Sequence, residues 1–182
     1  MTETDVREAF PAIAEITDDE LRAGVLRAWT ASLDETGHDL FEVPWFPPVQ
    51  EELNLPDERL VPHVNDVVES AVALADCLRD RRGSDVSMDL VRAGALVHDV
   101  SKLYEFDADG ETAIHDALGH PHYGVVPAAR GELPAAVLNV VLSHSGRTSV
   151  EPSTLEAVII KRADEAAAAA IRAEANDDPR ET

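Results

Sequence analysis

Residues 90–103 read LVRAGALVHDVSKL, a run of apolar residues that ends in a histidine, an aspartate and a lysine. Ser87 stands before the run at the position of a helix N-cap, so we expect a helix that begins there and continues through the run. The pair His98–Asp99 then follows an apolar helix, where unpaired polar groups are costly to bury. A bound metal ion would compensate that cost and an exposed helix end would avoid it, and this stretch leaves both open.

Helical patterns dominate the rest of the chain, and the alternation typical of half-buried strands is nearly absent. Thr17-Asp18-Asp19-Glu20 has the pattern of a capping box and predicts a helix over residues 17–35. Further helices are expected over residues 60–82, 124–130 and 134–144 and from Pro152 to Ala175, with loops over 41–56 and 107–123. The sequence therefore predicts an all-α fold.

Length and composition limit the kind of protein. The chain has 182 residues, which suits a single domain, and its one cysteine excludes an internal disulfide. The longest apolar runs, at 136–142 and 166–171, are too short to span a membrane. The N-terminus is acidic where a signal peptide is basic and then apolar. We therefore expect a cytoplasmic protein that does not bind membranes, and the sequence is compatible with a homodimer.

The charge of the chain is strongly unbalanced. Thirty-six acidic residues face 15 basic ones, for a formal net charge of −21, and the only lysines are Lys102 and Lys161. Such a surface repels nucleic-acid backbones, so no nucleic acid polymer is expected as a partner. Dense acid with little lysine is typical of halophilic proteins, and an ordinary acidic protein is the alternative.

Side chains of the metal-ligand type also border other apolar helices. His63 lies in the first turn of one, His144 ends the run AVLNVVLSH, and Asp164 ends AVIIKRAD. Each alone is more often a core histidine or a solvated aspartate, but their recurrence in one small helical domain favours a shared site. Imidazoles and carboxylates together suit a divalent Mn, Fe, Ni, Co, Mg or Zn ion. Two imidazoles and two carboxylates would give four protein ligands, which leave positions open for water and substrate, as metal-assisted hydrolysis requires.

The order His63, His98–Asp99, Asp164 resembles the H…HD…D signature of the HD-domain metal-dependent phosphohydrolases. The central motif of that family is similar to GALVHDVSKLYEF, although Ser101 replaces the more usual glycine. Three later segments also resemble family motifs, namely residues 119–124, 139–145 and 159–167. The resemblance covers about residues 60–172.

The resemblance implies a helical bundle around a metal site. Residues 60–175 would form the HD domain, residues 1–59 a helical preface with a proline-rich loop, and residues 176–182 an acidic tail. The implied reaction is hydrolysis of a phosphate ester or anhydride, with a nucleotide-like small molecule as substrate and metal-activated water as nucleophile. A metal-binding regulatory or interaction module without catalysis is the alternative.

The resemblance also assigns roles to residues. Metal ligands would be His63, His98, Asp99, His120, His144 and Asp164, which bind one or two ions. His120 is preferred to His115 and His122 because it precedes Gly124 by four residues, as in the family. Asp99 would orient the attacking water. Lys102, one helical turn after His98, would neutralise the phosphoryl group. Arg147 and Lys161 are further candidates for contact with the substrate.

The net charge yields a first prediction. Added KCl should raise the melting temperature from low to molar concentrations, because the Debye length shrinks to about 3 Å at 1 M and self-repulsion is screened. Thermal unfolding monitored by circular dichroism over a KCl series measures this. A melting temperature that stays level or falls would contradict the halophilic interpretation.

Overall fold

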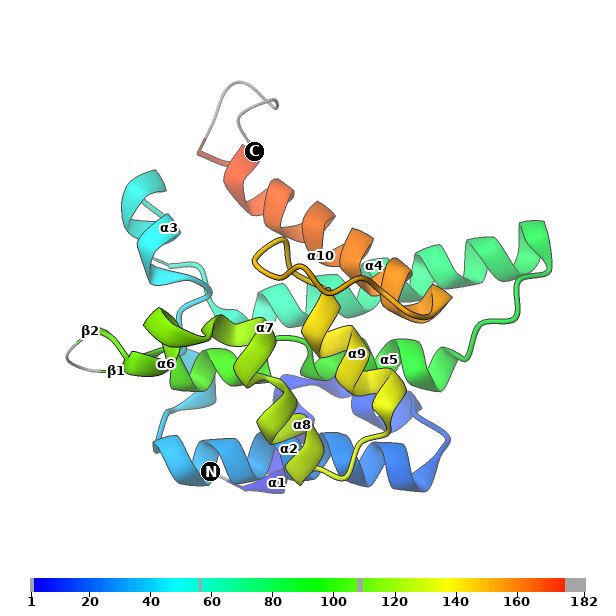
Figure 1. Ribbon diagram of the computed structural model, residues 1–182, viewed down its shortest axis with the longest axis horizontal. Helices are drawn as coiled ribbons and strands as arrows, with labels where there is room; N and C mark the ends of the chain where they lie inside the picture. Colours follow the sequence, from blue (N-terminus) through cyan, green and yellow to red (C-terminus); the bar gives the residue numbers. More distant parts are fainter. Residues whose placement is uncertain (1, 56, 108–109, 176–182) are drawn as a thin grey trace.

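The computed structural model describes residues 2–55, 57–107 and 110–175, so the predicted acidic tail lies outside the described residues. These residues form α-helices almost throughout, with one short antiparallel hairpin (Figure 1). The α-helices are α1 Glu3–Ala9, α2 Asp19–Thr36, α3 Pro47–Leu53, α4 Leu60–Arg82, α5 Met88–Val97, α6 Ala113–Ala117, α7 Gly119–Tyr123, α8 Val125–Arg130, α9 Ala135–Ser143 and α10 Leu155–Ala173. The 3₁₀ helices are η1 Pro11–Glu15, η2 Leu40–Glu42 and η3 Val100–Tyr104, and the strands are β1 Phe106–Asp107 and β2 Gly110–Glu111. The predicted all-α class is confirmed.

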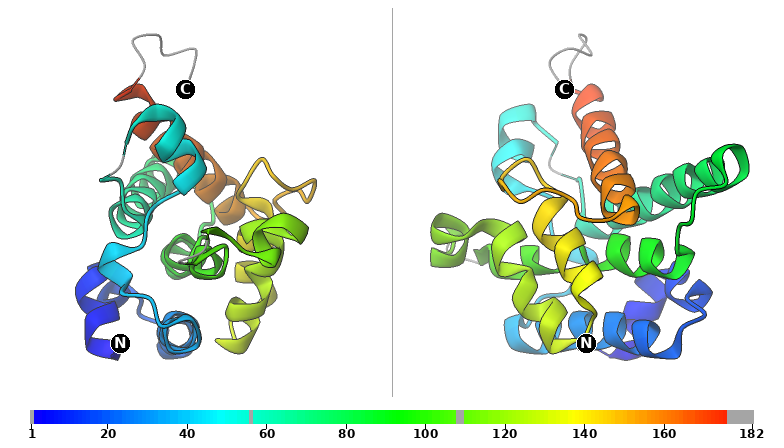
Figure 2. Two further views of the ribbon diagram at one scale, coloured as in Figure 1. Left: turned by 90° about the vertical axis from the view of Figure 1, so that its left-hand side faces the viewer. Right: turned by 45° about the vertical axis from the view of Figure 1, so that its right-hand side comes forward.

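Helix α5 lies at the centre of the bundle. Figures 1 and 2 show it between α2 on one side and α4 with α10 on the other, and α9 also packs against it. Its last residues, 93–97, are all buried. A Cβ atom on Gly94 would lie 2.8 Å from Ile160 Cδ1 and 3.1 Å from Val140 Cγ2. Glycine is therefore needed here so that α9 and α10 can approach α5 this closely.

The N-terminal helices share the core of the rest of the chain. The indole N–H of Trp29 in α2 donates a 2.9 Å hydrogen bond to the carbonyl of Leu96 in α5. The Trp29 ring also packs against Phe10, with ring centres 4.7 Å apart. Since α1, α2 and α5 contribute to one continuous cluster of buried side chains, the predicted preface packs directly on the helix that ends at His98.

Several predicted helix boundaries agree with the structure, and the predicted N-cap of α2 is wrong. Helices α4, α8 and α9 match the predicted ranges, and Ser87 caps α5. The N-cap of α2 is Asp18, whose side chain accepts from the amides of Glu20 and Leu21. Thr17 does not cap that helix because its hydroxyl donates instead to Asp89, at 2.6 Å, which ties the start of α2 to the start of α5.

Two segments predicted as loops contain helices. Within residues 41–56 lies α3, which begins with two prolines and is followed by a turn that the Gln50 amide holds by donating to the carbonyls of Leu55 and Glu58. Residues 107–123 contain α6 and α7, which are separated by Leu118, and α7 begins with Gly119 at φ +70°. These helices are too short to show a helical period in the sequence.

The ends of two long helices also differ from the prediction. The α-helix that starts at Met88 ends at Val97, and the chain continues as the 3₁₀ helix η3. The last helix begins at Leu155, where the Thr154 hydroxyl accepts from the Ala157 amide, and not at Pro152. Among the described residues, none of the helices combines the length and apolar character that a membrane crossing requires.

Candidate metal centre

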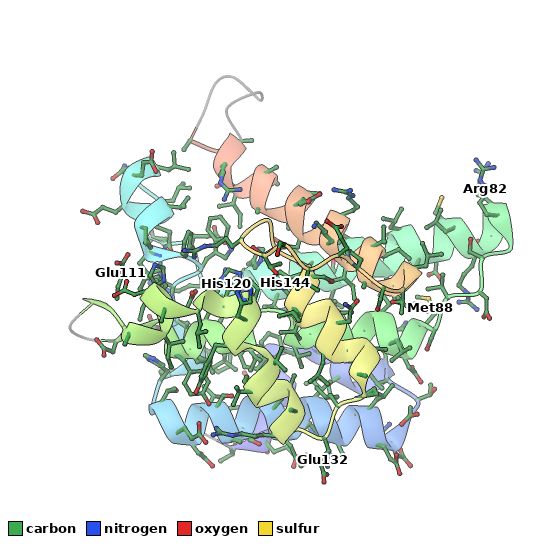
Figure 3. The ribbon with its side chains drawn as sticks, in the orientation of Figure 1. Arg82, Met88, Glu111, His120, Glu132 and His144 are labelled. Carbon is green, nitrogen blue, oxygen red and sulfur yellow. The ribbon has the colours of Figure 1, made fainter. Side chains whose placement is uncertain are left out.

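The six predicted metal ligands come from five helices and converge at one place. They are His63 at the start of α4, His98 and Asp99 after α5, His120 in α7, His144 at the end of α9 and Asp164 in α10. The His120 and His144 side chains lie next to each other near the middle of the molecule, with ring centres 5.3 Å apart (Figure 3). All six side chains are largely or fully buried, and Asp164 is the most accessible at 16%.

The Asp99 carboxylate lies between two pairs of imidazoles. Its Oδ2 atom is 3.4 Å from Nε2 of His63 and 3.4 Å from Nε2 of His98. Its Oδ1 atom is 3.4 Å from Nε2 of His144 and 3.6 Å from Nε2 of His120. Each oxygen therefore belongs to a separate cluster of ligand atoms, and the carboxylate joins the two clusters.

Asp164 completes the first cluster. Its Oδ1 atom lies 3.2 Å from Nε2 of His63 and 3.8 Å from Nε2 of His98. The same two imidazoles thus face the Asp99 carboxylate, which precedes η3, and the Asp164 carboxylate of α10. The second cluster consists of Asp99 and two imidazoles, so the first cluster is the richer in ligands among the described residues.

The hydrogen bonding of these side chains fits a divalent cation. Nδ1 of His98 lies 2.7 Å from the Ala95 carbonyl and Nδ1 of His144 lies 2.8 Å from the Val141 carbonyl. A carbonyl only accepts, so Nδ1 carries the proton in both rings and Nε2 presents its lone pair towards Asp99. Both Nε2 atoms are buried and make no hydrogen bond among the described residues, and the same holds for Asp99 Oδ1. Buried polar atoms without partners are rare, and a coordinated metal ion would satisfy these.

The charged and polar groups around Asp99 and Asp164 keep both carboxylates ionised. Burial by itself raises the pKa of Asp99, but the adjacent Lys102 ammonium and the neighbouring imidazoles hold it well below its usual range. For Asp164, burial is again outweighed, here by the His63 imidazole, whose Nε2 lies 3.2 Å from Oδ1, and by the nearby His98, and the pKa falls to about 2. Deprotonated carboxylates are the form that binds a metal ion.

Lys102 contacts Oδ2 of Asp99, the oxygen that also faces His63 and His98. Its Nζ lies 2.8 Å from Asp99 Oδ2, and the side chain is only 7% exposed. The ammonium group also lies 5.4 Å from the centre of the Trp45 ring and 5.7 Å from the centre of the Phe46 ring. These contacts hold a cation beside the candidate metal ligands and at the edge of a cavity.

Glu105 is a residue of the site that the sequence did not point out. It is fully buried, its Oε1 accepts from the backbone amide of His120 at 2.8 Å, and its Oε2 lies 3.3 Å from His120 Nδ1. A carboxylate behind a ligand histidine fixes the ring orientation and turns Nε2 towards the metal. His115 contacts this Glu105 at 3.4 Å, and the His122 ring bonds to the Leu118 carbonyl, so neither is placed among the ligand atoms. The only sequence signal for Glu105 is a carboxylate at the end of an apolar run.

A cavity of about 270 Å³ opens next to the clusters. It is lined by Trp45, Phe46, Asp99, Lys102, His120, Ser145, Gly146, Arg147, Asp164, Ala168 and Arg172. Arg147 therefore lines the cavity, and its contact with a substrate stays a prediction. Lys161 is not among the described residues that line the cavity. Trp45, Phe46 and Arg172 were not singled out, because nothing local in the sequence relates them to the histidines.

Comparison with known proteins agrees with this geometry. The sequence model of the HD domain matches residues 60–169. A protein of Methanocaldococcus jannaschii named dihydroneopterin 2′,3′-cyclic phosphate phosphodiesterase is 30% identical over 167 residues, which are 84% of this chain and 64% of the relative. Ribonuclease Y of Finegoldia magna is 31% identical over 84 residues, which are 46% of this chain and 14% of the relative.

The chain thus spans less than two thirds of the length of either relative. No solved structure matches it. The HD sequence model, in contrast, covers most of the chain, and its range includes each of the histidines and aspartates that meet around Asp99. On this evidence, the chain belongs to the HD domain family.

Proposed function

We propose that the chain is a metal-dependent phosphohydrolase that hydrolyses a phosphate ester or anhydride of a small, nucleotide-like molecule. The observation that carries this proposal is the Asp99 carboxylate, whose two oxygens face separate pairs of imidazoles at 3.4–3.6 Å. Asp99 Oδ1 and the Nε2 atoms of three of these imidazoles are buried and have no hydrogen-bond partner among the described residues, so they would provide ligands for a divalent cation. The adjoining cavity would give a substrate access to them.

The roles of the chain's own residues follow from their positions. A divalent cation held by these ligands supplies a Lewis acid for the phosphoryl oxygens and lowers the pKa of water. Lys102 lies beside Asp99 and lines the cavity, so its ammonium can neutralise the negative charge that develops on a phosphoryl group. Asp99 holds Lys102 in place and presents lone pairs towards both clusters. Its ionised carboxylate can accept a hydrogen bond from a water molecule and orient it.

The substrate class is supported by the relatives and by the charge of the chain. The relative from Methanocaldococcus jannaschii acts, by its name, on a 2′,3′-cyclic phosphate, which is a strained phosphodiester of a small molecule. Ribonuclease Y matches over a shorter segment. A net charge of −21 opposes the approach of an RNA backbone. We therefore propose a small cyclic phosphodiester as the first substrate to test.

A substrate panel tests this function. The protein, purified without chelator and supplied with Mn²⁺, should hydrolyse adenosine 2′,3′-cyclic phosphate or a generic aryl phosphate faster than a short RNA. Product formation is measured by liquid chromatography in parallel with the metal content. Bound metal without turnover of any member of the panel would favour the alternative, a regulatory or interaction module.

Substitutions at Asp99 and Lys102 should have different effects. Asp99→Ala, or the isosteric Asp99→Asn, should abolish hydrolysis and lower the metal content, because this carboxylate joins both clusters. Lys102→Ala should lower kcat roughly 10²- to 10³-fold and leave the metal in place, since Lys102 is not a ligand. Asp66→Ala, which removes an exposed carboxylate on the helix of His63, is the matched control. Full turnover in Lys102→Ala would refute the role given to Lys102.

The number of bound metal ions distinguishes a two-metal site from a site that binds a single ion. If both clusters bind an ion with Asp99 as the bridge, metal analysis after reconstitution with Mn²⁺ should give about two ions per chain. The double variant His120→Ala, His144→Ala should then bind one ion fewer, because it leaves only the cluster of His63 and His98 intact. A stoichiometry of one that the double variant does not change would assign His120 and His144 to the substrate.

A further inference from the structure

Two arginines in the wall of the cavity lie against aromatic rings and not against carboxylates. Cζ of Arg147 is 5.5 Å from the centre of the Phe46 ring, and Cζ of Arg172 is 5.5 Å from the centre of the Trp45 ring. Other arginines of the chain pair with acidic residues, as Arg130 does with Glu35 at 2.6 Å. Among the described residues, no carboxylate pairs with either guanidinium group of the cavity, although the chain contains 36 acidic residues.

An arginine held by an aromatic ring keeps its hydrogen-bond donors. The attraction is between the positive charge and the ring face, and it consumes none of the five N–H groups. Neither Arg147 nor Arg172 donates a side-chain hydrogen bond to a described residue, and Arg147 is exposed. The two guanidinium groups are therefore positioned by the protein, and their donors are not used by any described side chain or carbonyl, which is the state that binds a planar or tetrahedral anion.

Both rings already contact cationic side chains. Trp45 is 3% exposed, because Lys102 and Arg172 lie over it and the His63 ring packs against it with ring centres 5.5 Å apart. Phe46 is partly buried between Lys102 and Arg147. Both rings thus serve to hold cations, and the ligand that this arrangement fits is an anion.

Three of these four residues lie outside the part of the chain that the HD sequence model matches. Trp45 and Phe46 precede residue 60, and Arg172 follows residue 169. Backbone hydrogen bonds hold the aromatic pair beside the start of α4, from Trp45 to the Glu58 carbonyl at 3.3 Å and from Leu60 to the Val43 carbonyl at 2.9 Å. The flanking segments of this chain therefore complete the wall of the cavity.

We propose that Arg147 and Arg172, held by Phe46 and Trp45, form an anion clamp that binds a phosphate group of the substrate. The clamp rests on the proposed function, since it serves the same cavity as the metal ligands and Lys102. The phosphate has two potential sources. It is either the scissile phosphoryl group itself or a second, non-scissile phosphate of the same molecule, and both present the same tetrahedral, negatively charged oxygens.

Equilibrium binding of two probes tests the clamp. The dissociation constants of inorganic phosphate and of methylenediphosphonate, which is not hydrolysed, are measured by calorimetry on protein loaded with Mn²⁺ and freed of excess metal. Arg147→Gln and Arg172→Gln should each raise the dissociation constant about 10- to 100-fold, the effect of losing a charge-assisted hydrogen bond. Phe46→Leu should raise it about 2- to 5-fold, because the arginine loses its ring. Arg82→Gln, at the far end of α4 (Figure 3), should have no effect.

The two probes distinguish the sources of the phosphate. An equal loss for both probes supports a clamp on the scissile group, and a larger loss for methylenediphosphonate supports a clamp on a second phosphate. Unchanged dissociation constants in both arginine variants, at wild-type metal content, would overturn the clamp even if the protein is an active hydrolase. Weakened binding in a protein that hydrolyses no substrate would retain the clamp and reject the proposed function alone.

Discussion

The structure depends on one buried charge, the carboxylate of Asp99. An ionised carboxylate in a protein interior is costly unless charges or ligands surround it. Here Lys102 and four imidazoles lie around its two oxygens, and three of the imidazoles, His63, His120 and His144, come from segments far from Asp99 in the sequence. The bundle is therefore organised around a point of high polarity, and a divalent cation is the group that best satisfies the ligand atoms left without partners.

Small residues make this convergence feasible. A Cβ atom on Gly124 would lie 2.5 Å from Val141 Cγ1 and 2.8 Å from the His120 carbonyl, so glycine lets α7 approach α9 and brings His120 beside His144. Gly94 likewise lets α9 and α10 approach α5 closely. The spacing of Gly124 after His120 thus has a physical reason, because the second cluster forms only when these helices are in close contact.

The cavity combines two kinds of contribution. The residues within 60–169 supply the candidate metal ligands and Lys102, which carry the proposed chemistry. The segments before and after supply Trp45, Phe46 and Arg172, which line the cavity with two aromatic rings and a guanidinium group. In a chain with a net charge of −21, such local positive charge is the means by which an anionic substrate would be retained.

The sequence alone determined the helical class, the presence of the long helices and the order of the candidate ligands, because helical periods are local properties. It did not show α3, α6 and α7, which are too short to display a period. Only the tertiary structure decided which oxygen of Asp99 faces which imidazole, that Glu105 supports His120, and that Trp45 and Arg172 reach the cavity. These relations join residues distant in the chain, and they arise from how the helices pack, which no local pattern of residues encodes.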